Sequence, residues 1–134
     1  MNKNTGSFWR EPYHIINLCF AGIIWMIFIY SGIFSAEKNN HPIKSACEIF
    51  TGEPCSSTGL SRSFSEIVRF RFDSAKTFNP HGLKVFGFFL IQFFLRFLVS
   101  FLIYKNKKLQ IPVIVADILL SIILYVYCFW GIIF

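Results

Sequence analysis

The chain has 134 residues, enough for one domain, and 54% of them are hydrophobic, including 18 phenylalanines. Its mean hydropathy is +0.55, and a soluble domain of this size could not bury that much apolar surface, so the composition indicates a membrane protein. The net charge of +6 lies in loops and flanks rather than in a stripe interleaved with exposed aromatic residues. We therefore expect the basic residues to contact membrane lipids, and we do not expect the protein to bind nucleic acid.

Residues 15–34 predict a first membrane span. This segment has twenty residues, of which only Asn17 and Ser31 are clearly polar, and as a helix it is about 30 Å long, the thickness of the hydrocarbon core. Tyr13 precedes it at the position of an interfacial aromatic belt. A cleaved signal peptide is the alternative, although its apolar region is usually shorter, roughly 7–15 residues.

The segment after the first span predicts a turn-rich loop followed by a short helix. Ser63 and Glu66 have the spacing of a capping box, in which the side chain of each residue accepts a hydrogen bond from the backbone N–H of the other. Apolar residues then recur at helical spacing, which predicts an amphipathic helix over residues 63–78 lying on the membrane surface with its Phe/Ile/Val face toward lipid. Asn79 and Pro80 end this helix, because a residue before proline avoids the α conformation.

The same loop carries a set of motif residues: Cys47, Cys55, Gly59, Arg62, Asn79 and Pro80. They resemble the signature of the bacterial membrane-protein family called domain of unknown function 2752, in which Cys-Pro, a short gap and Cys-Pro-x-Cys-Gly-x-Thr-Arg are followed by Asn-Pro before a hydrophobic span. Thr58 stands where that family has a third cysteine. The resemblance implies an integral membrane protein and brings no established activity.

The two loop cysteines leave several possibilities open. A disulfide between Cys47 and Cys55 is permitted if the loop lies outside the cytoplasm; free thiols, or a metal or catalytic role, are the alternatives. Zinc usually takes four ligands, and only His41 and His81 could assist, from a distance. Arg62 could bind a lipid phosphate or cap its turn. The sequence contains no recognisable catalytic motif, so we assign no catalytic residue, metal or cofactor.

Residues 83–104 and 111–134 predict the second and third spans, and the short loop between them makes these helices antiparallel neighbours. Arg96 lies about 12 Å and Asp117 about 9 Å from that loop along their helices. An unpaired ion at this depth is costly, so we predict an intramembrane ion pair between them. Arg96 extending alone toward the loop, or a proton or ion pathway, are the alternatives. Polar residues on the same two faces are expected nearby: Gln92, Ser100, Ser121 and Tyr125.

The whole chain is thus predicted to be one all-α membrane domain, residues 1–134, in which residues 35–82 form the cysteine-containing loop with its interfacial helix. The positive-inside rule places the N-terminus and the basic loop 105–110 on the cytoplasmic side and the loop 47–80 outside. The family resemblance implies that the membrane is the inner membrane of a bacterium. We expect a non-enzymatic subunit, accessory or assembly factor of a membrane complex, which binds a membrane protein or a second copy of itself. The alternatives are a thiol- or lipid-active enzyme that uses the loop cysteines and Arg62, and a small oligomeric transporter.

Overall fold

A computed structural model of the chain describes residues 11–37, 46–53 and 57–134. Within these ranges every regular element is a helix. Three helices are long: α2 (Pro12–Ile33), α6 (Gly82–Lys105) and α7 (Gln110–Ile133). The others are short: α3 (Ala46–Thr51), α4 (Leu60–Val68), α5 (Phe72–Phe78) and the 3-10 helix η2 (Lys107–Leu109).

The three long helices are each long and apolar enough to cross a membrane. Their ends lie within three residues of the predicted spans. The predicted fold class, an all-α membrane protein with three spans, is therefore confirmed. Apolar side chains cover most of the outer surface of these helices, which is the surface that lipid tails cover in a bilayer.

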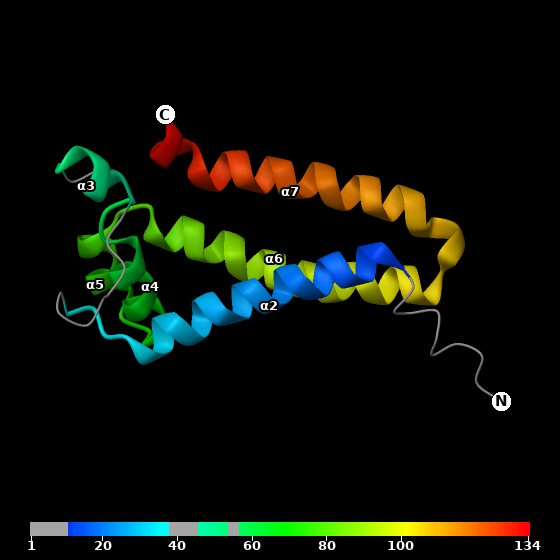
Figure 1. Cartoon of the computed structure of the whole chain (residues 1–134), viewed down its shortest axis with the longest axis horizontal. Helices are drawn as coiled ribbons and strands as arrows, with labels where there is room; N and C mark the ends of the chain where they lie inside the picture. Colours follow the sequence, from blue (N-terminus) through cyan, green and yellow to red (C-terminus); the bar gives the residue numbers. More distant parts are fainter. Residues whose placement is uncertain (1–10, 38–45, 54–56) are drawn as a thin grey trace.

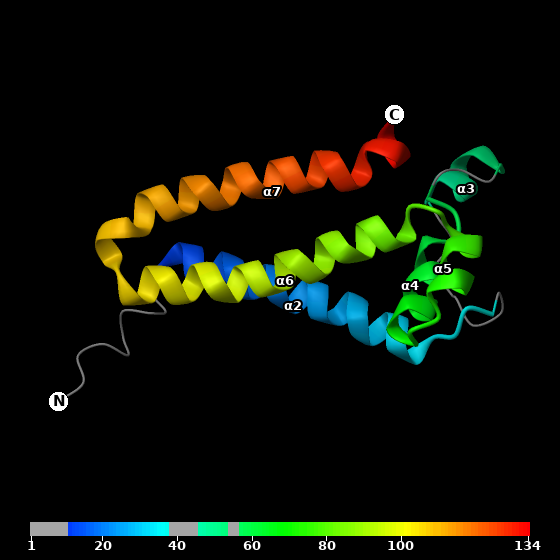
Figure 2. The same cartoon turned by 180° about the vertical axis from the view of Figure 1, so that it is seen from behind.

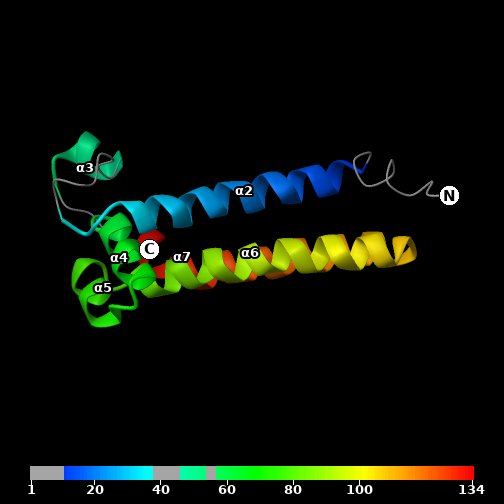
Figure 3. The same ribbon diagram turned by 90° about the horizontal axis from the view of Figure 1, so that it is seen from below.

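Helix α6 lies at the centre of the molecule, with α2 and α7 packed against it (Figures 1 and 2). Figure 3 shows that α4 and α5 lie together across one end of this bundle. Toward that end, α2 and α7 diverge from each other (Figure 1). The buried residues of α2 recur at intervals of three, four and seven, the spacing of a helix–helix seam: His14, Asn17, Ala21, Ile24 and Ser31.

The predicted interfacial helix over residues 63–78 is wrong in its extent, because the chain forms two helices there, α4 and α5. They are separated by a Schellman turn, in which the N–H groups of Phe70 and Arg71 bond to the carbonyls of Ile67 and Glu66. Phe70 has a φ of 59°, in the left-handed region. Glycine usually takes this position, and its absence from the sequence removes the signal that would have predicted the break.

The apolar face of α4 packs against α6 rather than against lipid. Phe64 is buried with Ile67 in a core cluster that includes Val85 of α6, and its ring meets that of Phe86 edge-on at 5.3 Å between centroids. The predicted capping box is also wrong, because Ser63 lies inside α4, where its N–H bonds to the carbonyl of the residue four before it. Helix α4 therefore covers one end of the bundle and contributes side chains to its core.

Helix α4 is fixed to the end of α2 by Arg69 and Ser65. The Arg69 guanidinium donates to the carbonyls of Gly32 at 3.1 Å and Phe34 at 3.3 Å, and the Ser65 hydroxyl donates to Phe34 at 2.7 Å. The last carbonyls of a helix have no partner within it and carry partial negative charge, so a cation stabilises this end. These bonds hold the short helices in a defined position over the spans.

Candidate functional site

Polar side chains from all three spans meet inside the bundle. We call this group the intramembrane cluster and define it by seven residues: Tyr13 and Asn17 of α2, Gln92, Arg96 and Ser100 of α6, and Asp117 and Ser121 of α7. Polar side chains inside a membrane are costly unless they are bonded, and they mark sites of structural or functional importance. The cluster is therefore the first candidate site.

Arg96 and Asp117 form the centre of the cluster, as the sequence predicts. Arg96 Nη2 lies 2.5 Å from Asp117 Oδ1, and the two side chains are only 11% and 1% exposed. The Tyr13 hydroxyl donates to the other carboxylate oxygen of Asp117. Arg96 does not extend toward the α6–α7 loop, so that alternative is wrong. The carboxylate instead accepts bonds from α6 and α2 at once and joins the three helices.

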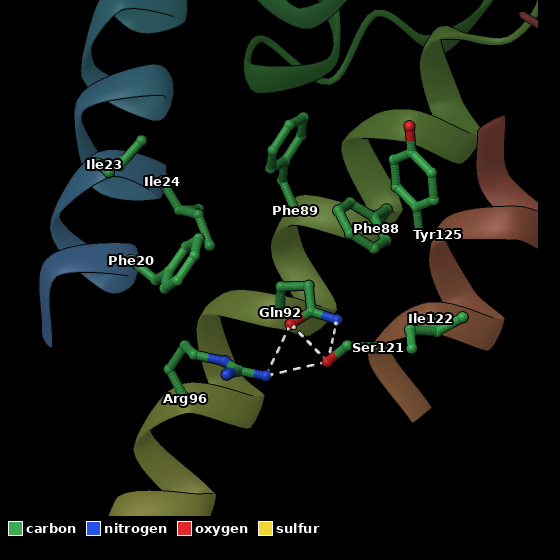
Figure 4. Close-up of a pocket in the computed structure, with 10 residues that line it drawn as sticks. All are labelled: Phe20, Ile23, Ile24, Phe88, Phe89, Gln92, Arg96, Ser121, Ile122 and Tyr125. Carbon is green, nitrogen blue, oxygen red and sulfur yellow. Dashed lines mark hydrogen bonds between the residues drawn. The ribbon is translucent and has the colours of Figure 1, made fainter. Parts of the chain in front are cut away.

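The Arg96 guanidinium also bonds to three neutral side chains. Its Nη1 donates to Asn17 Oδ1 at 3.1 Å, and its Nη2 lies 3.0 Å from Gln92 Oε1 and 3.1 Å from Ser121 Oγ. Figure 4 shows the bonds that join Arg96, Gln92 and Ser121. The remaining donor, Arg96 Nε, is buried and finds no acceptor among the residues that the structure describes.

The structure brings some of the predicted neighbours to the pair and places others elsewhere. Gln92 and Ser121 bond to each other, at 3.2 Å, beside the pair. Ser100 instead accepts from Asn17 at 3.3 Å. Tyr125 lies outside the bonded cluster, where its ring stacks on that of Phe129 at 4.8 Å between centroids. Its predicted place beside the ion pair is therefore wrong.

Sequence reasoning missed the contribution of α2. The sequence predicts an interfacial aromatic residue at Tyr13 and only an isolated polar residue in a span at Asn17. The two are four residues apart and so lie on one face of a helix. That spacing, together with the rarity of Asn in a span, is the signal that could have placed both beside a polar partner.

An apolar cavity of about 410 Å³ adjoins the cluster, between α2 and α7 and alongside α6. Its polar lining consists of Gln92, Arg96 and Ser121 (Figure 4). The other lining residues come from the same three helices and are aliphatic or aromatic: Phe20, Ile23, Ile24, Phe88, Phe89, Ile122 and Tyr125. The cavity therefore has apolar walls and hydrogen-bonding groups at the cluster.

The motif residues Gly59 and Asn79 form a joint between α4 and α6. Gly59 has a φ of 80°, and a Cβ there would lie 2.4 Å from the carbonyl oxygen of Phe78, so no other residue fits. The buried Asn79 side chain donates to the Thr58 carbonyl at 3.1 Å and accepts from the His81 N–H at 2.9 Å. These contacts fix where the second span begins.

Two further motif residues, Arg62 and Pro80, lie close to the same connection. The Arg62 guanidinium lies over the Phe78 ring, 6.0 Å from its centroid, a cation–π contact. Pro80 lies between the end of α5 and the start of α6. Of the predicted disulfide between Cys47 and Cys55, the whole of Cys55 and the side chain of Cys47 fall outside the part of the chain that the structure describes. Among the described residues, no three His, Cys, Asp or Glu side chains lie close enough together to hold a metal ion.

Comparison of the chain with protein-family models, curated proteins and solved structures finds no match. The resemblance of the loop motif to the family called domain of unknown function 2752 therefore stays a prediction.

Proposed function

We propose that this multi-pass membrane protein is an accessory or assembly subunit of a membrane complex and performs no catalysis of its own. The proposal rests on one observation, which is that the polar groups inside the membrane are bonded to one another. Arg96 and Asp117 bond to each other and to neutral side chains of all three spans. Groups engaged in this way hold helices together, which is the role expected of a rigid structural subunit.

The exposed surface of α7 supports a partner within the membrane. In this helix, which the structure describes in full, Asp117 and Cys128 are the buried residues. Leu119 and Val126 lie about half a turn around the helix from Asp117 and are 56% and 44% exposed. A helix that packs against one neighbour leaves an apolar face for another helix or for lipid, and van der Waals packing drives such association in membranes.

We further propose that the protein lies in the bacterial cytoplasmic membrane with its N-terminus in the cytoplasm and α4 and α5 outside. The turn between α6 and α7 carries the exposed residues Lys105, Lys107 and Lys108. Short cytoplasmic loops are enriched in such residues. The resemblance of the loop motif to a bacterial membrane family supports the choice of membrane.

The partner is tested by purification of the full chain from membranes in a mild detergent. We expect a second membrane polypeptide at fixed stoichiometry, lost from the double variant Leu119→Trp and Val126→Trp. The matched control is Met26→Trp on the exposed face of α2, where Met26 is 71% exposed, and it should retain the partner. Trp remains compatible with lipid, so both variants should insert normally. A wild-type chain that elutes as a 15.6 kDa monomer with no partner would contradict the proposal.

The orientation is tested by labelling the thiols of intact cells with a membrane-impermeant maleimide. Cys47 and Cys55 should react from outside, either directly or after reduction if they form a disulfide. Cys19 and Cys128, which lie within α2 and α7, should not react under either condition and serve as internal controls. Labelling of the loop cysteines only after the cells are lysed would contradict the proposal and would place the loop in the cytoplasm.

A further inference from the structure

Residues that line the cavity beside Arg96 are also exposed on the apolar outer surface of the spans, among them Phe20 and Ile122. The cavity lies between two spans that diverge toward the α4 end of the bundle (Figure 1). Its volume of about 410 Å³ falls within the range of about 300–1,000 Å³ that is usual for small-molecule sites. A ligand that reaches it must therefore dissolve in the lipid phase.

The walls of the cavity favour a flat ring. Three phenylalanine rings and one tyrosine ring line it, Phe20 from α2, Phe88 and Phe89 from α6, and Tyr125 from α7 (Figure 4). Aromatic side chains bind planar groups by offset or edge-to-face contacts in addition to burying their area. The aliphatic residues between them suit an apolar tail.

The polar end of the cavity includes Arg96, a side chain with an unused hydrogen-bond donor. Arg96 Nε is buried without an acceptor among the described residues, while both Nη atoms of the same guanidinium are bonded to protein. A buried donor without an acceptor is destabilising. A ligand oxygen reaches this nitrogen when the guanidinium turns toward the cavity, and by accepting from it the ligand gains affinity. Gln92 and Ser121 lie beside it in the lining.

The charge of the cluster selects against an anion. Arg96 is already paired with Asp117 at 2.5 Å, so the seven residues that define the cluster carry one positive and one negative charge. A carboxylate or phosphate would add an uncompensated negative charge in a low-dielectric site. A neutral acceptor, such as a carbonyl oxygen, meets no such penalty.

We propose that this cavity binds a neutral, lipid-soluble carbonyl compound, with a quinone-type ring between the aromatic walls, a carbonyl oxygen at Arg96 and an apolar tail directed to the lipid. The proposal goes beyond the accessory role and does not depend on it, because it concerns a ligand of the chain itself and needs no partner protein.

The proposal is tested with the full chain in phosphatidylcholine nanodiscs and an azido-benzoquinone that carries a decyl tail. Photolysis should label α2, α6 or α7, and decyl-benzoquinone should compete with the label in a saturable manner. Decylbenzene has the same ring size and tail but no oxygen, and we expect it to compete at least about tenfold more weakly, the loss expected for one buried hydrogen bond.

Variants of the cavity wall locate the site. Ile122 lines the cavity and is 55% exposed, whereas its neighbour Ile123 is 64% exposed and does not line it. Ile122→Trp should fill the space and reduce labelling at least about tenfold, and the matched control Ile123→Trp should label as the wild type does. Phe20→Trp fills the opposite wall and gives an independent test if Ile122→Trp does not fold, as judged by circular dichroism.

Three results would overturn the proposal. The first is equal competition by decylbenzene, which would mean simple partition into an apolar space. The second is unchanged labelling in folded Ile122→Trp and Phe20→Trp, which would place the probe elsewhere. The third is a partner helix, a second copy of this chain or a phospholipid that remains in the cavity and that the quinone does not displace.

Discussion

Removal of the negative charge from the ion pair is expected to destabilise the protein by a predictable amount. Breaking a buried pair by removing one partner costs about 3–5 kcal/mol. In Asp117→Asn, Arg96 keeps its bonds to Asn17, Gln92 and Ser121, so we expect the low end, about 3 kcal/mol. In Arg96→Met the Asp117 carboxylate keeps only the bond from Tyr13, so we expect about 5 kcal/mol.

The measurement is reversible unfolding in mixed detergent micelles, followed by circular dichroism. A loss of about 3 kcal/mol lowers the folding equilibrium constant about 150-fold. The double variant should lose about 3 kcal/mol less than the sum of the two single losses, because the second substitution removes a charge that the first left unpaired. The control is Lys84→Met, which removes an exposed charge whose contact is the Tyr127 ring and should cost less than about 1 kcal/mol.

Two outcomes would refute this reasoning. Single losses that add to within about 0.5 kcal/mol in the double variant would mean that the two charges do not interact. A larger loss in Asp117→Asn than in Arg96→Met would mean that the neutral acceptors around the guanidinium do not stabilise it.

Three further changes test the joints of the fold. Gly82→Ala should destabilise by about 1–3 kcal/mol in the same unfolding assay, because its Cβ would lie 1.9 Å from a serine hydroxyl of α4, whereas Gly87→Ala meets no atom within 4 Å and should be neutral or stabilising. Arg69→Met should speed hydrogen exchange of the α4 amides, because the variant loses three hydrogen bonds to backbone carbonyls. The control Arg71→Met removes a side chain whose partner is a single glutamate and should change the exchange rate little. Equal effects of the two substitutions would contradict the role of Arg69 in holding α4. Phe70→Gly should raise stability in detergent by about 1 kcal/mol by relieving the left-handed conformation, and a loss would show that its exposed ring makes a necessary contact.

The spans and the central ion pair were predictable because both depend on local signals. Length and hydropathy define a span regardless of its neighbours. The depth of Arg96 and Asp117 followed from counting residues on either side of one short turn, which forces α6 and α7 to be antiparallel. Nothing in that count requires a third helix.

The parts that were not predicted depend on contacts between distant segments. The place of Tyr13 and Asn17 in the cluster depends on how α2 is rotated against α6, and the long connection between those helices leaves that rotation free. The division of the predicted helix at Phe70 depends on a left-handed residue that is not glycine, which has no composition signal. The role of Gly59 and Asn79 as a joint became visible only when Phe78 and Thr58 were brought beside them.

The closeness of Arg96 and Asp117 along the chain, 21 residues apart across one tight turn, constrains how the nascent protein enters a bilayer. Helix α2 leaves the ribosome first, before its polar partners exist. Helix α6 follows with the Arg96 cation, whose insertion at mid-span costs about 2.5–3.5 kcal/mol. This cost lasts until α7 has been synthesised and Asp117 can pair with Arg96. Co-translational insertion of α6 and α7 as one helical hairpin avoids this intermediate, and synthesis of the last helix is then the step that completes stable integration.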